Sequence, residues 1–318
     1  MARHHVQMTE WYRDVSTDIF KLCAACNFEP TPNQQAPLLQ AVQDGRQAIA
    51  VRSGQGPGKC LCLTGTCYNA RMGIRQNMKE MIGRRIGVPS MDPEAETIST
   101  QRATAFESGR KKCVKVLVDS GQSLDLSNDH PVYTPEGFVA ANGLKEGDLV
   151  AMPRLLPPPE KTLDISDPEV RFLAAMLCDG SLTHKNCNWT HLPGPVADQF
   201  CKDVESLGGG WSVQPPRSKA LVVSVTGLRP LVRGWGIDCL SKHKRVPARF
   251  YGLNDQQLGE FFNVVFSCDG YLCKDGFEIA LASKPFIEDI QTLLLRFGVH
   301  SRFRYKKTKC QTGVFDSW

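Results

Sequence analysis

Hydrophobic and polar positions divide the chain into three stretches with different patterns. Residues 1–59 read as helices, followed by a short apolar strand at 48–52 and a glycine-rich loop. Residues 60–154 are rich in Val, Leu and Thr with frequent glycines, which is typical of a β-rich domain. Residues 155–318 alternate apolar helical segments with strands. Three consecutive prolines cannot lie inside a helix or a central strand, so we predict a linker at 154–160.

The third stretch contains an internal repeat. An apolar helical run that ends in Cys-Asp-Gly occurs twice, and its aspartates are Asp179 and Asp269. Each copy continues into strands and a second helix, which we expect at 195–207 and at 285–297. The simplest organisation is a duplicated αββαβ unit, and the fold class predicted for the chain is α+β.

Composition narrows the class of protein. Apolar residues make up 42% of the chain, and no apolar run approaches the roughly 20 residues of a membrane-spanning helix. The N-terminus has no secretory pattern, so we expect no membrane association and reduced cysteines in a cytoplasm. The net charge is +5, and basic residues cluster at 71–85, 242–249 and 296–309. Such clusters suit a nucleic-acid surface or simply a solvated face.

A phosphate-binding loop is the first candidate site. Residues 50–59 run from the end of the predicted strand into the loop and nearly match the P-loop pattern, in which backbone N–H groups turn inward around phosphate. Cys60 stands where that pattern has a magnesium-binding Ser or Thr, so the motif is interrupted after residue 59. A glycine turn without function is the alternative. The residues that would hold the phosphates are Ser53, Gly54, Gly58 and Lys59.

The segment before this loop resembles the start of the ATPase domain of a phage terminase large subunit or a related helicase-like motor. The resemblance rests on a Pro-x-x-Gln element within 30–35 and on the strand and loop at 48–59. It implies that residues 1–59 are a fragment of an α/β P-loop NTPase in a bacterial or phage-infected cell. ATP and Mg²⁺ would then be ligands of the complete ATPase only, because no acidic Walker B strand follows in this sequence.

From Cys60 the sequence resembles the N-terminal half of an intein, the Hint-type domain that carries out protein splicing. The opening block is Cys60-Leu-Cys-Leu-Thr-Gly-Thr. A second block contains Ser127-Asn-Asp-His130-Pro, where the family has Thr-x-x-His-Pro. Residues 140–154 match the closing strand of that half. The resemblance implies a splicing domain at 60–154 whose partners are the flanking extein segments in cis.

The residue types in these blocks suit the chemistry of splicing. The Cys60 thiol would attack the carbonyl of Lys59 and form a thioester, because cysteine is a strong nucleophile and a good leaving group. His130 would protonate the departing amide nitrogen, and Ser127 would hold that amide by a hydrogen bond. A structural histidine before a proline turn is the alternative for His130. Cys62 is an alternative first residue, but only excision before Cys60 restores the phosphate loop.

The duplicated helices resemble the paired motif helices of LAGLIDADG homing endonucleases, over roughly 165–318. The resemblance implies that the two helices pack at a pseudo-twofold axis and that Asp179 and Asp269 bind Mg²⁺, a cation that prefers hard oxygen ligands. Residues 244–247 match a Lys-x-h-Pro block of the family, where h is a hydrophobic residue, before the second helix. The match implies that Lys244 is a cation that stabilises the transition state. Double-stranded DNA is the expected partner, contacted by basic strands.

Two other interpretations stay open at this point. In the first, the function of the chain is that of its host protein, a DNA-packaging ATPase. In the second, the third stretch is a DNA-binding remnant that has lost cutting. The intein family ends in His-Asn followed by Cys, Ser or Thr, and nothing in the sequence matches. We therefore expect a truncated chain, an incomplete endonuclease domain at 155–318, and splicing that needs a C-terminal intein fragment as partner.

Overall fold

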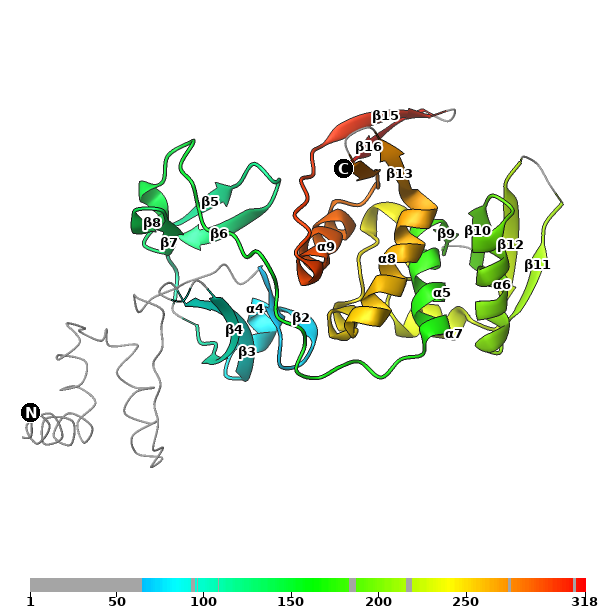
Figure 1. The fold of residues 1–318 in the computed structure, drawn as a ribbon, viewed down its shortest axis with the longest axis horizontal. Coiled ribbons are helices and arrows are strands. Elements are labelled where there is room, and N and C mark those ends of the chain that lie inside the picture. Colours follow the sequence, from blue (N-terminus) through cyan, green and yellow to red (C-terminus); the bar gives the residue numbers. More distant parts are fainter. Residues whose placement is uncertain are drawn as a thin grey trace, which may run out of the picture.

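A computed structural model describes most of the chain from residue 65 onward. The described residues are 65–92, 95, 97–107, 109–182, 187–215, 219–273, 276–310 and 313–318. They form a mixed α/β structure with two parts, a strand-rich part and a helix-rich part, which one extended segment connects (Figure 1). The predicted phosphate-loop residues lie outside the described residues, as do Cys60 and Cys62.

The strand-rich part consists of antiparallel pairs of short strands. The pairs are β1 (Thr66–Asn69) with β2 (Ile74–Asn77), β3 (Arg85–Asp92) with β4 (Thr97–Thr104), β5 (Cys113–Leu117) with β6 (Ser123–Ser127), and β7 (Pro131–Thr134) with β8 (Gly137–Ala140). The short helix α4 (Met78–Met81) follows β2, and the 3-10 turn η1 (Ala141–Gly143) follows β8. The Val- and Thr-rich pattern predicted this strand content.

The helix-rich part contains the two copies of the repeat. The first copy is α5 (Asp167–Cys178), β9 (Gly180–Ser181), β10 (Cys187–His191), α6 (Pro195–Ser206), β11 (Gly210–Val213) and β12 (Leu221–Thr226). The second is α8 (Asp255–Asp269), β13 (Gly270–Cys273), β14 (Gly276–Ile279), α9 (Lys284–Leu294), the 3-10 turn η4 (Leu295–Phe297), β15 (Lys306–Cys310) and β16 (Gly313–Ser317). Between them lie α7 (Arg229–Gly234) and the 3-10 turns η2 (Ser241–His243) and η3 (Ala248–Gly252).

Each copy ends in two strands, so the unit is αββαββ and the predicted αββαβ unit is one strand short. The missed strand of the first copy is β11, a strand of four residues that are all exposed. The strands of the first copy form one antiparallel sheet in the order β11-β12-β10-β9. Those of the second copy form two separate hairpins, β13–β14 and β15–β16.

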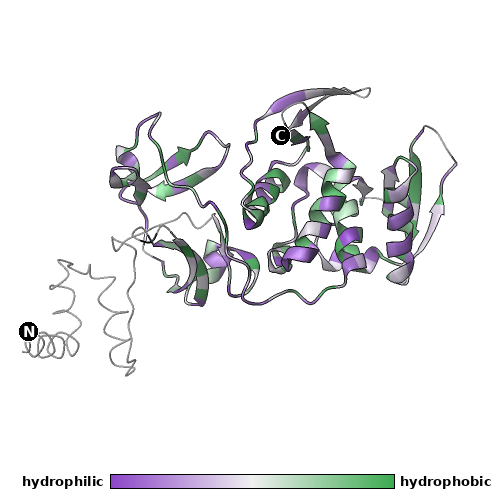
Figure 2. Cartoon of the chain, viewed as in Figure 1, coloured by the Kyte–Doolittle hydropathy of each residue, from purple (hydrophilic) through white to green (hydrophobic). Residues whose placement is uncertain are grey.

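The helices α5 and α8 pack against each other at the centre of the helix-rich part. Each begins at a side-chain cap, since Ser166 accepts a hydrogen bond from the Glu169 N–H and Asn254 accepts one from the Gln257 N–H. Helix α5 is buried on nearly all sides, as expected of a helix without a polar face. The outer helix α6 is different: hydrophilic residues cover much of it, while hydrophobic residues fill the neighbouring strand β12 (Figure 2).

The proline-rich linker contacts both parts. The Tyr68 hydroxyl donates to the carbonyl of Pro157 (3.4 Å), and the Glu160 N–H donates to the carbonyl of Ala70 (2.8 Å). On the other side, the Leu156 N–H donates to the carbonyl of Leu295 (3.0 Å). Residues 154–160 contain no helix or strand, in agreement with the prediction.

In the described part of the chain, no helix combines the length and the hydrophobicity that crossing a membrane requires.

Candidate active site

The two repeated aspartates lie together at one end of the paired helices. Asp179 caps the C-terminus of α5, and its N–H donates to the carbonyl of Ala175 (3.0 Å), while Asp269 is the last residue of α8. A Cβ atom at Gly180 would lie 2.3 Å from the carbonyl oxygen of Met176, so only glycine lets the chain turn away there. The sequence repeat therefore becomes a pair of carboxylates in one place.

The electrostatics of this pair favour a positive partner. Burial and, to a smaller extent, the negative charge of Asp269 raise the pKa of Asp179 to about 6, although the charges of His191 and Lys244 act in the opposite direction. Burial also raises the pKa of Asp269. Within the described part of the chain, the buried Oδ2 atom of Asp269 accepts no hydrogen bond. Two desolvated carboxylates with an unsatisfied oxygen fit a bound divalent cation.

Lys244 lies at this site, as the sequence predicted, but its ammonium group also holds the end of α5. The side chain is buried, and Nζ donates to the carbonyls of Met176 (3.0 Å), Cys178 (3.2 Å) and Gly180 (2.7 Å). These three acceptors match the three N–H donors of an ammonium group. Burial lowers the pKa of Lys244. Lys244 and Asp269 also line a small cavity of about 140 Å³.

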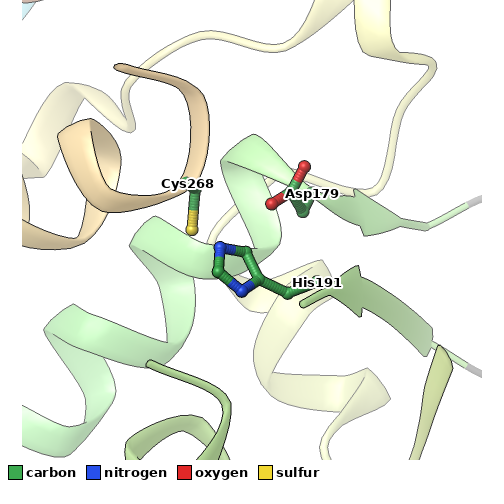
Figure 3. A group of neighbouring side chains, drawn as sticks. All are labelled: Asp179, His191 and Cys268. Atoms are coloured by element: carbon green, nitrogen blue, oxygen red, sulfur yellow. The ribbon is translucent and has the colours of Figure 1, made fainter. Parts of the chain in front are cut away.

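Two further residues at the site were not among the sequence predictions. His191 ends β10, and its ring is parallel to that of Trp189, with 5.0 Å between the centroids. Cys268 is the α8 residue before Asp269. Possible ligand atoms of Asp179, His191 and Cys268 all lie within 4.8 Å of one another (Figure 3). The repeated Cys-Asp-Gly triplet could have pointed to Cys268 as a site residue. No sequence signal pointed to His191, because only the fold brings its strand to the site.

The predicted splicing residues of the described chain lie in one tight turn. Ser127 is the last residue of β6 and is completely buried, and the His130 N–H donates to its carbonyl (2.9 Å). The Ala141 N–H then donates to the carbonyl of His130 (2.8 Å), which joins the turn to η1. The structure therefore brings Ser127 and His130 together, but Cys60 lies outside the described residues and has no position relative to them.

Comparison with known proteins identifies part of the helix-rich region. Residues 256–316 match the family model of the LAGLIDADG-like domain. The replicative DNA helicase DnaB of Rhodothermus marinus is 26% identical over 269 residues, which make up 76% of this chain and 28% of the helicase. The chain thus spans less than a third of the length of that relative.

Structural neighbours include an intein and a homing endonuclease. The Ssp DnaB mini-intein variant M86 matches with a TM-score of 0.30 and 15% identity, over 34% of this chain and 68% of the mini-intein. The endonuclease I-DmoI, in a complex with DNA and Mn, matches with a TM-score of 0.35 and 15% identity, over 48% of this chain and 89% of I-DmoI.

Proposed function

We infer that the helix-rich part is a homing endonuclease that hydrolyses phosphodiester bonds of double-stranded DNA with Mg²⁺. The observation that carries this inference is the pair Asp179 and Asp269, two buried carboxylates at the ends of packed helices, one of them with an unsatisfied oxygen. The match of residues 256–316 to the LAGLIDADG-like domain supports it. A non-cutting DNA-binding remnant is the competing interpretation, and the presence of both carboxylates speaks against it.

The residues of the chain have distinct tasks in this reaction. When bound, Mg²⁺ activates water and neutralises charge on the phosphate. Asp179 and Asp269 would hold the cation, and Asp179 is ionised at neutral pH because its pKa of about 6 lies below 7. Lys244 keeps the last turn of α5, and with it Asp179, in position through its three hydrogen bonds.

A cleavage assay tests the endonuclease. Supercoiled plasmids that carry a randomised insert are incubated with the full chain and Mg²⁺, and linear products are sequenced to find the target. Asp179→Asn and Asp269→Asn are expected to lose cutting by at least about 100-fold, since each removes a charged ligand. Asp198→Asn, which changes an exposed residue of α6, is the matched control and should cut normally. Cutting by Asp179→Asn at the parent rate would refute the assignment.

A second proposed activity belongs to the strand-rich part: N-terminal thioester formation at Cys60 in an intein-type element. The turn that joins Ser127 to His130 is the observation that favours it. A thiol such as dithiothreitol would intercept the thioester and release residues 1–59, which mass spectrometry detects. Cys60→Ala is expected to abolish release and His130→Ala to reduce it, while Cys113→Ala, at an exposed thiol, leaves it unchanged. If release of the N-terminal segment depends on Cys62 and not on Cys60, the first residue of the intein is Cys62.

The host of this element is proposed to be a DNA-handling P-loop ATPase, such as a phage terminase or a helicase. The similarity to a DnaB helicase and the phosphate-loop pattern around Lys59 support this proposal. ATP and Mg²⁺ would bind only after splicing joins Lys59 to the residue that supplies the magnesium-binding hydroxyl. Sequencing the gene beyond codon 318 tests it: a Walker B strand is expected after an intein terminus of His-Asn and Ser or Thr, and its absence would refute the host assignment.

A further inference from the structure

The candidate active site holds more donor types than an endonuclease of this design needs. Asp179, His191 and Cys268 come from three different elements, the end of α5, the end of β10 and the last turn of α8. Their ligand atoms lie within 4.8 Å of one another, and Figure 3 shows the Cys268 sulfur and the Asp179 carboxylate beside the His191 ring. Mg²⁺ uses oxygen ligands, whereas imidazole and thiolate favour Zn²⁺-type cations.

The orientation of His191 suits a metal ligand. Its Nδ1 atom lies 3.1 Å from the carbonyl oxygen of Leu192, which only accepts hydrogen bonds. Because this contact is shorter than the 3.5 Å contact between Nε2 and the carbonyl oxygen of Ser267, the hydrogen of the neutral ring is best placed on Nδ1, and Nε2 can then offer its lone pair to a metal. Nε2 points toward the end of α8, 3.5 Å from the carbonyl oxygen of Ser267 and next to Cys268. A carbonyl that fixes the ring and its tautomer in this way is the usual support of a metal-bound histidine.

A second sulfur is close at hand. The repeated Cys-Asp-Gly triplet places Cys178 on α5 opposite Cys268 on α8, and a hydrogen bond with Cys268 is the main reason why the pKa of Cys178 is raised. A carboxylate, an imidazole and a thiolate are three ligands of the kind that hold Zn²⁺, and the Cys178 thiol lies next to this group of three without belonging to it.

We propose that Asp179, His191 and Cys268 bind a thiophilic divalent cation such as Zn²⁺. Occupancy of this site takes Asp179 away from the pair it forms with Asp269. This second consequence rests on the proposed endonuclease function: micromolar Zn²⁺ would inhibit Mg²⁺-dependent cutting. Binding itself needs neither DNA nor cutting, so the two ideas can fail separately.

Cobalt spectroscopy tests the site directly. The reduced, metal-free full chain is titrated with Co²⁺, which gives thiolate-to-cobalt charge-transfer absorption and intense visible bands in a tetrahedral site, and Zn²⁺ is then added to displace it. The expected result is one equivalent of bound Co²⁺ whose charge-transfer absorption disappears in Cys268→Ser. His191→Gln should weaken binding by at least about tenfold. Cys201→Ser, which changes a half-buried thiol of α6, is the matched control and should keep the full signal.

Each outcome decides something. A charge-transfer signal that survives unchanged in both Cys268→Ser and His191→Gln would have to come from other cysteines and would overturn the proposal. Thermal unfolding shows whether Cys268→Ser is folded, and His191→Gln probes the same site from β10 while leaving Cys178 and Cys268 in place. If the parent binds no Co²⁺ at these residues but still cuts DNA in an Asp179-dependent way, the metal-site proposal fails and the endonuclease proposal stands. A cobalt site in a chain that never cuts would leave the metal proposal intact.

Discussion

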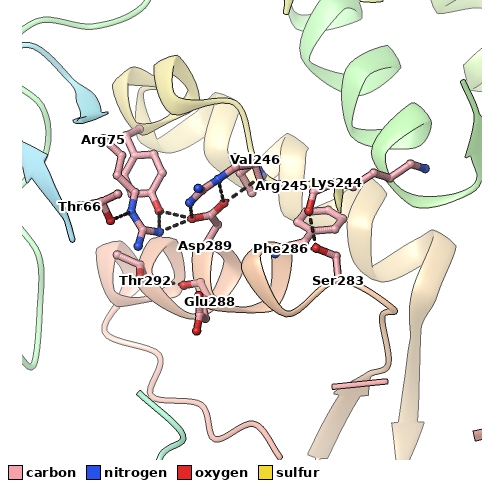
Figure 4. Close-up of polar contacts among 11 residues, drawn as sticks. Thr66, Arg75, Lys244, Arg245, Val246, Ser283, Phe286, Glu288, Asp289 and Thr292 are labelled. Carbon is pink, nitrogen blue, oxygen red and sulfur yellow. Dashed lines mark hydrogen bonds and ion pairs between the residues drawn. The ribbon is translucent and has the colours of Figure 1, made fainter. Parts of the chain in front are cut away.

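The carboxylate of Asp289, completely buried in α9, forms an ion pair with Arg75 of β2, a strand of the other part of the chain (Figure 4). Arg245 donates to the same carboxylate (2.9 Å), as do the Tyr251 hydroxyl (3.2 Å) and the Val246 N–H (3.1 Å). One buried group thus collects donors from both parts, which makes it the centre of the contact between the strand-rich and the helix-rich regions.

Removing the charge of Asp289 is expected to destabilise the chain strongly. Asp289→Asn leaves the guanidinium groups of Arg75 and Arg245 without their partner, and breaking a buried pair in this way costs about 3–5 kcal/mol. The free energy of unfolding, measured by urea titration, should fall by that amount. Asp119→Asn is the matched control, because Asp119 and Arg302 form an exposed pair between the same two regions, worth about 0–1 kcal/mol. Equal losses in both variants would contradict this account.

The raised pKa of Asp179 predicts a pH-dependent stability difference. Because the pKa is about 6 in the folded chain and 3.8 in the reference state, the folded chain binds this proton more tightly. Ionisation of Asp179 therefore lowers stability as the pH rises from 3.8 to 6. Asp179→Asn stays neutral, so its melting temperature should equal that of the parent below this window and exceed it above.

Magnesium supplies the control for that experiment. If the carboxylate pair holds Mg²⁺ as proposed, Mg²⁺ should raise the melting temperature of the parent at pH 7.5, since a ligand of the native state stabilises it by mass action. The same addition should leave Asp179→Asn nearly unchanged. A parent whose melting temperature is independent of Mg²⁺, or a variant that is less stable than the parent at pH 7.5, would show that the carboxylate has a structural role instead.

Lys244 is expected to act on stability as well as on activity. Lys244→Met leaves the carbonyls of Met176, Cys178 and Gly180 without their donor, and each unsatisfied buried acceptor costs about 1–3 kcal/mol. Scanning calorimetry should show a lower melting temperature together with a loss of cutting. A cation that acts only on the transition state would give the second effect without the first, so an unchanged melting temperature would assign Lys244 to chemistry alone.

The sequence predicted those features that depend on local pattern. The repeat located the helices that end at Asp179 and Asp269, and the triple proline located the linker, because apolar periodicity and backbone constraint are visible in single segments. His191 and the pair between Arg75 and Asp289 were missed, since each joins elements that only the fold brings together. The strand β11 was also missed, since it is only four residues long and buries none of them. Local patterns therefore predict elements, while contacts across distant segments need the structure.

Two glycines, Gly259 inside α8 and Gly270 directly after it, should respond in opposite ways to alanine. A Cβ atom at Gly270 would lie 2.6 Å from the carbonyl oxygen of Phe266 and 3.0 Å from its Cα, and backbone cannot move aside cheaply. Gly270→Ala is therefore expected to destabilise the chain by about 1–3 kcal/mol and to shift the adjacent Asp269. At Gly259 nothing lies within 4 Å of the added atom, so Gly259→Ala should stabilise the helix by about 0.5–1 kcal/mol.

Thermal unfolding and the cleavage assay together separate these two effects. Gly259→Ala should melt higher and cut as the parent does, because this glycine lies near the start of α8, away from the carboxylates. Gly270→Ala should lose cutting even at temperatures where it is fully folded, because the end of α8 positions Asp269. If Gly270→Ala cuts normally while folded, the exact turn after Asp269 is unimportant, and the glycine of the repeated triplet serves only the stability of the helix end.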